Sequence, residues 1–148
     1  MKLGDHIYTR IDLRPLGQTI YHHGIYCGYD RVIHYQAPFG LYGTVVETYL
    51  SDFVKDYSFR VYVENHQNCS VYPPNEVVAR AKSRLGEQRY SAYFNNCEHF
   101  ALWCKTGEHS SPQVKHTKQV VKAVLYASTT PSQAASELIN KVFKRMKR

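Results

Sequence analysis

Alternating apolar and polar positions dominate the first half of the chain, and they predict β-strands. Residues 4–10 alternate well enough to form a first strand, which the Pro15-Leu16-Gly17 segment ends. Residues 19–35 contain two runs of β-branched and aromatic residues around a Gly-Tyr-Asp turn, which is the pattern of a hairpin. Residues 44–50 and 59–63 predict two further strands, and we expect a helical turn near residues 50–53.

Helical spacing of apolar residues replaces this alternation in the second half of the chain. One helix is predicted over residues 76–85, after Pro73-Pro74-Asn75 and before Gly86. Asn96 predicts the N-cap of another helix, because asparagine is among the residues that cap a helix best, and Gly107 predicts its end. Strands followed by helices indicate an α+β domain.

Cys97 falls in the first turn of the second predicted helix. The main-chain N–H groups at a helix start and the positive end of the helix dipole favour a thiolate, which is the nucleophilic form of cysteine. We therefore predict that the pKa of Cys97 lies well below the free-thiol value of about 8.5. The alternative is a small buried hydrophobic residue that happens to follow a cap, which is how most free cysteines behave.

Three histidines flank the predicted hairpin turn, and a thiol nucleophile needs a base of this kind. A three-residue loop centred on Gly28 would place His22 opposite His34, with Cβ atoms roughly 4.5–5.5 Å apart. A two-residue turn would instead pair His23 with His34, and such turns are also common. The residues alone leave both registers open. His6, in the first strand, is expected at the surface or at a strand edge.

Two motifs resemble the signatures of a known family. They are the run HHGIYCG from His22 to Gly28, which Arg31-Val32-Ile33-His34 follows, and the later Asn96-Cys97-Glu98-His99-Phe100. Both closely resemble motifs of the lecithin:retinol acyltransferase-like family, and the resemblance covers residues 4–107. It implies a circularly permuted papain-like fold of the NlpC type, with an antiparallel sheet packed against the helix that bears the cysteine.

The resemblance also implies catalytic roles for three residues. Cys97 matches the nucleophile and His34 matches the histidine that orients the base. The family places the base twelve residues before that second histidine, which selects His22 and leaves His23 in a variable position.

The activity that the resemblance implies is cleavage of a fatty-acyl ester, and a phospholipid is the expected substrate. The acyl group would form a thioester with Cys97 and then pass to water, an alcohol or an amine. Two alternatives are a permuted papain-like cysteine peptidase or isopeptidase, and a module that binds a membrane or a protein without catalysis. The second histidine argues against the peptidase, which typically uses a dyad, and the three filled catalytic positions argue against the binding module.

Composition and charge indicate one globular domain with a basic extension. The chain has 148 residues and is 43% hydrophobic, which suffices for one core. Residues 1–108, the predicted catalytic domain, carry equal numbers of basic and acidic residues, so the formal net charge of +7 belongs to residues 109–148. Two helices are predicted in this extension, after Ser111-Pro112 and after Thr130-Pro131. The second helix has an apolar stripe beside a basic face, which suits either an anionic membrane surface or packing on the domain.

Several other features are not expected from this sequence. The four cysteines lack Cys-x-x-Cys spacing, so we predict neither a disulfide framework nor a metal site, and no cofactor is implied. The basic extension lacks a recognisable nucleic-acid-binding motif, so nucleic acid is not an expected partner. No N-terminal leader and no apolar run of about 18 residues is present. We therefore expect a cytoplasmic protein, with the C-terminal helix as a candidate peripheral membrane contact.

Overall fold

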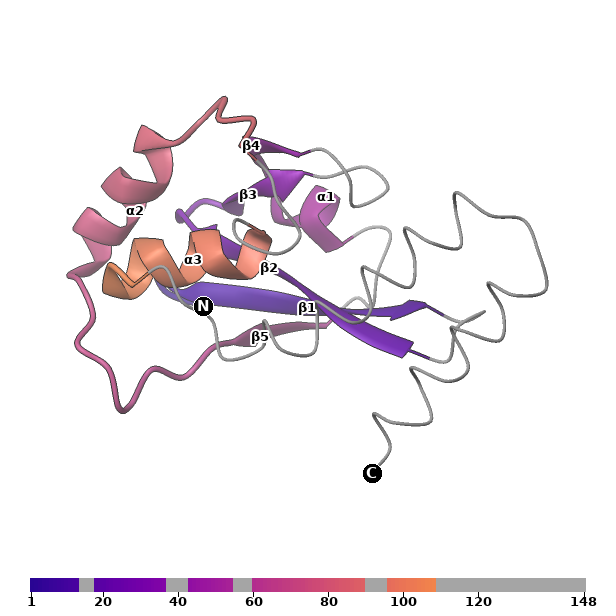
Figure 1. Ribbon diagram of the computed structural model, residues 1–148, viewed down its shortest axis with the longest axis horizontal. Coiled ribbons are helices and arrows are strands. Elements are labelled where there is room, and N and C mark those ends of the chain that lie inside the picture. Colours follow the sequence, from indigo (N-terminus) through magenta and orange to yellow (C-terminus); the bar gives the residue numbers. More distant parts are fainter. Residues whose placement is uncertain (14–17, 37–42, 55–59, 90–95, 109–148) are drawn as a thin grey trace. The chain divides into compact units, whose positions relative to one another are not determined.

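The computed structural model describes residues 1–13, 18–36, 43–54, 60–89 and 96–108 (Figure 1). The elements within these ranges are, in order, β1 (His6–Leu13), β2 (Gln18–Tyr26), β3 (Arg31–Gln36), β4 (Thr44–Tyr49), α1 (Leu50–Val54), β5 (Val61–Val63), α2 (Pro74–Ser83) and α3 (Cys97–Thr106). They confirm the predicted α+β class. The two predicted C-terminal helices lie outside the described residues. Within the described residues, no helix has both the length and the apolar character needed to cross a membrane.

The strands form one antiparallel sheet in the order β4-β3-β2-β1-β5. β1 pairs with β2 along its whole length, and β5 pairs with the other side of β1. β3 pairs with β4 along its whole length, whereas its pairing with β2 covers only residues 24–26 of β2. The first half of β2 therefore extends beyond its pairing with β3.

The register of the β2–β3 hairpin differs from both predicted registers. His34 lies directly opposite Gly24, and not opposite His22 or His23. His22 and His34 still share one face of the sheet, because side chains alternate between faces along a strand. The two histidines are diagonal neighbours across the strands, because His34 lies opposite Gly24 and His22 is two residues before Gly24.

The hairpin loop explains this register. The main-chain N–H of Cys27 donates to the carbonyl oxygen of Arg31 at 2.8 Å, which leaves Gly28, Tyr29 and Asp30 as the loop. All three residues have positive φ angles, of 80°, 50° and 55°. The predicted three-residue loop was centred on Gly28, whereas the observed loop begins at Gly28 and is centred on Tyr29. Aspartate also tolerates the left-handed region, and here Tyr29 enters it as well.

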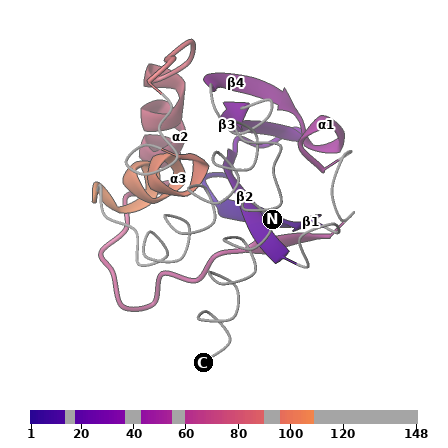
Figure 2. The same ribbon diagram turned by 45° about the vertical axis from the view of Figure 1, so that its right-hand side comes forward.

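The two faces of the sheet carry different helices. On one face, Ile25, Ile33 and Tyr35 pack in a core with residues of α2 and α3, and we call this the α3 face. On the other face, Val32 packs against Phe53 of α1, and we call this the Phe53 face. Figure 2 shows α2 and α3 on one side of β3 and β4, and α1 on the other.

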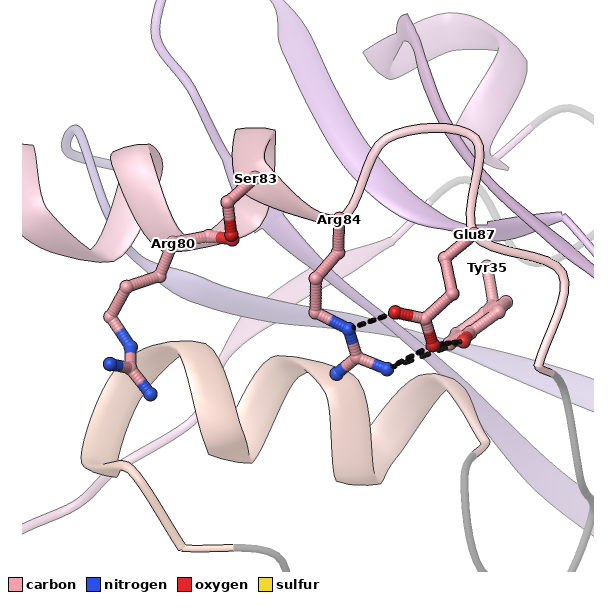
Figure 3. A network of polar contacts seen from close by, with 5 residues as sticks. All are labelled: Tyr35, Arg80, Ser83, Arg84 and Glu87. Atoms are coloured by element: carbon pink, nitrogen blue, oxygen red, sulfur yellow. Dashed lines mark hydrogen bonds and ion pairs between the residues drawn. The ribbon is translucent and has the colours of Figure 1, made fainter.

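A polar network holds the end of α2 against the sheet (Figure 3). The Arg84 Nε donates to Glu87 Oε2 at 2.7 Å, and the Tyr35 hydroxyl donates to Glu87 Oε1. The main-chain N–H of Val45 donates to the carbonyl oxygen of Glu87 at 3.0 Å. The Arg84 guanidinium also lies 5.0 Å above the ring of Trp103. These contacts tie α2 to β3, β4 and α3.

Candidate active site

Asn96 and Gly107 bound α3 as the sequence predicted. The Asn96 Oδ1 accepts hydrogen bonds from the main-chain N–H groups of Glu98 and His99, each at 3.0 Å. Gly107 ends the helix in the left-handed conformation, with φ 83°. The predicted position of Cys97 at the start of a capped helix is therefore confirmed.

The Cys97 thiol lies beside the edge of β2 that faces β3. Its sulfur is 3.9 Å from the carbonyl oxygen of Tyr21, and the main-chain N–H of His23 donates to it. Odd-numbered residues in this part of the chain direct their main-chain groups towards β3, as the hydrogen bond from the Cys27 N–H to the Arg31 carbonyl oxygen shows. The pairing of β2 with β3 nevertheless ends at Gly24, so the main-chain groups of Tyr21 and His23 on this edge are not paired with β3. The thiol thus contacts main-chain groups on both sides of His22.

Burial raises the pKa of the Cys97 thiol to about 11, so the predicted low pKa is wrong for this structure. The main-chain N–H groups of His23, Glu98 and Cys97 itself do lower the pKa, as expected at a helix start, whereas the Glu98 carboxylate raises it. The loss of hydration outweighs the N–H groups because a thiolate is poorly solvated where apolar residues surround it. At neutral pH Cys97 is therefore a neutral thiol.

His22 and His34 meet on the Phe53 face. The Nε2 of His22 lies 2.9 Å from the Nδ1 of His34, and their rings are nearly perpendicular. The Nε2 of His34 lies 3.0 Å from the Thr48 hydroxyl oxygen. Phe53 stacks on the His22 ring with centroids 4.9 Å apart and packs edge-on against His34. The structure thus brings the two predicted histidines together and adds Thr48 and Phe53 to them.

Gly24 makes this arrangement possible. A Cβ atom at position 24 would lie 2.7 Å from Val32 Cγ1, 3.1 Å from the Phe53 ring and 3.2 Å from the Cβ of His34. These distances are shorter than ordinary carbon–carbon contacts. Only glycine leaves room there for the aromatic ring and the second histidine.

Burial keeps both imidazoles neutral at pH 7. It lowers the pKa of His34 to about 4, against a smaller opposing effect of the Tyr35 main chain. Burial also lowers the pKa of His22 well below 6.5, and repulsion from His34 and His23 adds to this. A neutral imidazole carries the lone pair that a general base needs.

His23 points to the α3 face and belongs to a second chain of histidines. Its Nδ1 lies 2.9 Å from the Nε2 of His6, and the Nδ1 of His6 lies 3.0 Å from the Nε2 of His66. The expectation that His6 lies at the surface or a strand edge is wrong, because β5 pairs beyond β1 and His6 is only 2% exposed. Burial lowers the pKa of all three histidines, that of His23 to about 3.

The two histidine chains therefore lie on opposite faces of β2, with the thiol at its edge. The Cys97 sulfur contacts the main chain of β2 at Tyr21 and His23. The described ranges of the chain contain no group of three or more His, Cys, Asp or Glu residues arranged to hold a metal ion. The chemistry that the site offers is that of a partly buried thiol, main-chain donors and neutral imidazoles.

The sequence of this chain matches a known protein family. The family model for lecithin retinol acyltransferase matches residues 1–110. The chain belongs to the lecithin retinol acyltransferase family. Lecithin retinol acyltransferases of Mus musculus and Homo sapiens are 28% and 29% identical to it over 145 residues, which cover 80% of this chain and 63% of theirs. Protein LEAD-SENSITIVE 1 of Arabidopsis thaliana is 31% identical over 156 residues, which cover 72% of this chain and 58% of that protein.

Membership of the lecithin retinol acyltransferase family confirms the resemblance that the two motifs indicated. The chain spans less than two thirds of the length of these relatives. The family match includes β2, β3 and α3, which carry the three candidate residues. Sequence reasoning missed Thr48, whose position opposite Val32 puts it on the face of His34. The role of Thr48 can be inferred only once the pairing of β3 with β4 is known.

Proposed function

We propose that this member of the lecithin retinol acyltransferase family transfers fatty-acyl groups through a thioester on Cys97. The observation that carries the proposal is the setting of the sulfur at the capped start of α3, where three main-chain N–H groups lower its pKa. Donors of this kind stabilise a thiolate and also the oxyanion that forms when a thiolate attacks an ester carbonyl. The family relationship supports the same chemistry.

In the first half-reaction, His22 takes the proton of Cys97 and the sulfur attacks the carbonyl carbon of the ester. The carbonyl electrons move to the oxygen, and their return breaks the bond between the carbonyl carbon and the ester oxygen. The departing alcohol takes the proton from His22. The acyl group remains on Cys97 as a thioester.

In the second half-reaction, water, an alcohol or an amine gives a proton to His22 and attacks the thioester. The carbon–sulfur bond breaks, and Cys97 regains its proton from His22. Water produces a fatty acid, whereas an alcohol or amine produces a new ester or amide. The enzyme returns to its starting state without a cofactor.

His34 and Thr48 have an orienting role in this scheme. If His22 donates its Nε2–H to the Nδ1 of His34, and His34 donates its Nε2–H to the Thr48 oxygen, then the Nδ1 of His22 carries the lone pair. This tautomer presents a base to the thiol. It also gives the His22 imidazolium a hydrogen-bond partner after proton transfer.

The proposed proton transfer needs a hydrogen bond between His22 and Cys97 in the ester complex. Without substrate, the thiol lies at the edge of β2 and the His22 ring lies on the Phe53 face, and both groups are neutral. Catalytic hydrogen bonds are often long in the absence of substrate and shorten in the substrate complex. We propose that binding of the ester aligns this hydrogen bond for proton transfer.

A phospholipid is the proposed acyl donor, and the fold is proposed to be the circularly permuted papain-like one. The names of the mammalian relatives refer to lecithin, an ester lipid, and to retinol, an alcohol. A cytoplasmic enzyme with this substrate must reach a membrane surface, and residues 131–148 are the proposed contact. Deletion of these residues should weaken co-sedimentation with anionic vesicles, and unchanged co-sedimentation would place the contact elsewhere.

Release of fatty acid from phospholipid vesicles tests the proposal. Cys97→Ser should reduce the rate to a trace, whereas the matched variant Cys69→Ser, which changes an exposed thiol, should keep it. Activity that persists in Cys97→Ser would contradict the mechanism. A fluorogenic peptide and an isopeptide-linked substrate belong in the same assay, because cleavage of these alone would favour the peptidase alternative.

A further inference from the structure

β2 carries two consecutive histidines, and the proposed chemistry uses the side chain of only one of them. The His22 ring faces His34 and Phe53, whereas the His23 ring faces away, towards His6. The main chain of His23 is nevertheless the part of β2 that lies against the nucleophile. Its position there follows from the pairing of the strands.

The hairpin geometry directs the His23 N–H towards the thiol. The main-chain groups of Tyr26 bond to the segment before β1, and those of Cys27 bond to Arg31, so odd-numbered residues of β2 face β3. The pairing of β2 with β3 stops at Gly24, one residue short of His23. The sulfur of Cys97 lies next to this edge, 3.9 Å from the carbonyl oxygen of Tyr21.

We propose that His23 serves the Cys97 site through its main-chain N–H, which stabilises the thiolate and then the oxyanion, and that His6 positions this N–H by holding the His23 ring. The inference rests on the proposed thiol chemistry and deepens it. Each link between two rings needs one N–H and one lone pair. The chain from His66 through His6 to His23 therefore couples the tautomers of the three rings and holds their orientations.

The surroundings of this chain keep it uncharged. His6 experiences the positive charge of Lys105 from α3 as well as those that His23 and His66 would carry. Tyr8 packs beside the His23 ring, and the Tyr62 ring stacks on Tyr8. Burial and the nearby Glu64 carboxylate raise the pKa of Tyr8, so its hydroxyl is also uncharged at pH 7. Burial and these neighbouring charges both disfavour a positive charge on His6, so the middle ring of the chain is neutral at pH 7.

Exchange of a single amide for an ester tests the main-chain role directly. A synthetic segment 1–26 can be ligated to residues 27–148 because Cys27 supplies the required N-terminal cysteine. Replacing the amide between His22 and His23 by an ester removes only the His23 N–H and weakens one carbonyl. The matched control places the ester between Ile20 and Tyr21, which removes another N–H on the same edge of β2.

The measurement is the alkylation rate of Cys97 by iodoacetamide between pH 7 and 10.5, with each thiol resolved by mass spectrometry. A hydrogen bond to a charged group has a strength that corresponds to roughly a tenfold change or more. The ester at His23 should therefore slow alkylation of Cys97 at pH 8 about tenfold relative to the control ester. Equal profiles would overturn the inference. Because alkylation needs no acyl ester, that outcome is distinct from failure of the proposed function, which would appear as the absence of a thioester.

Two conservative variants test the positioning role of His6. His6→Gln keeps a polar group near the position of Nε2 and hence the contact with His23, whereas His6→Asn keeps only the contact with His66. His6→Asn should slow alkylation of Cys97 severalfold, and His6→Gln should restore much of the loss. The double variant His6→Asn/His23→Ala should slow alkylation no more than the single variants, because both changes remove the same hydrogen bond between the two rings. Additive losses, or equal effects of Asn and Gln, would overturn the positioning role.

Discussion

The sulfur of Cys97 lies 3.9 Å from the carbonyl oxygen of Tyr21, beside the part of β2 that extends beyond its pairing with β3. The neighbour of the proposed nucleophile is thus the main-chain edge of a strand whose side chains include two histidines. Alternation along the strand sends one of these histidines to each face. Packing of the thiol against this strand removes part of its hydration, which raises its pKa and keeps it neutral at pH 7.

Slow alkylation of Cys97 in the resting protein is the first prediction. A pKa of about 11 leaves very little thiolate at pH 8, so Cys97 should react with iodoacetamide at least about tenfold more slowly than the exposed Cys69. Alkylation between pH 7 and 10.5, followed by peptide mapping, gives both rates in one sample. A Cys97 that titrates below about 8.5 would contradict the buried, neutral thiol.

Substitution of the neighbouring histidines should separate their roles. His22→Ala should reduce the rate of acyl transfer at least about a hundredfold, because a general base is lost. His23→Ala keeps its main-chain N–H and should cost much less, and His34→Gln should fall between the two. Single-turnover rates on one ester give the order. If His23→Ala proves the most damaging, the base lies on the α3 face instead.

Gly24→Ala should disturb the packing of the His22 and His34 rings. The added methyl group would lie 2.7 Å from Val32 Cγ1 and 3.2 Å from the Cβ of His34, so the free energy of unfolding should fall by about 1–3 kcal/mol. Urea unfolding measures this loss. Gly86→Ala serves as a control for the acyl-transfer rate, since its Cβ would meet no atom within 4 Å. Its φ of 82° is unfavourable for alanine, so this variant should also lose stability, through the backbone rather than through a clash. The acyl-transfer rate should fall in Gly24→Ala and not in Gly86→Ala.

The buried histidines should make the protein sensitive to acid. The folded-state pKa values of His34 and His23, about 4 and about 3, lie below the unfolded value of about 6.5. Protonation therefore favours the unfolded chain, so the stability these groups contribute is complete above pH 6.5 and is lost as the pH falls towards 4 and 3. Each group can cost up to about 1.4 kcal/mol per pH unit in this window.

Urea midpoints at pH 7.5, 6 and 5 test this acid sensitivity. His34→Asn replaces a titrating ring by an amide that retains a polar group near Nδ1, so its midpoint should fall less steeply with pH than that of the unchanged protein. A midpoint that stays constant from pH 7.5 to 5 would show that the histidines titrate normally.

Local patterns predicted much of the fold and the site. The cap at Asn96, the stop at Gly107 and the strand segments each follow from residues close in sequence, and all are present. The residues alone left open whether His22 or His23 meets His34, and the family resemblance selected His22. The contact is present although the register is shifted, because a shift of two residues keeps both side chains on one face.

The incorrect predictions concern features that the local sequence does not determine. The hairpin register depended on three consecutive residues with positive φ, which a single glycine does not signal. The burial of His6 depended on β5, some fifty residues later, and the pKa of Cys97 depended on packing against β2 rather than on its own helix. Neither the pairing of β5 nor the approach of α3 to the strand edge is encoded in a local motif.

Intact-mass analysis after incubation with phospholipid vesicles tests the central claim most directly. We predict a protein species heavier by one acyl group, with the added mass on the peptide that contains Cys97, sensitive to hydroxylamine and absent from Cys97→Ser. His22→Ala should accumulate this species at least about a hundredfold more slowly. An adduct on another residue, or fatty-acid release by the unchanged protein that proceeds equally in Cys97→Ser, would contradict a thioester on Cys97.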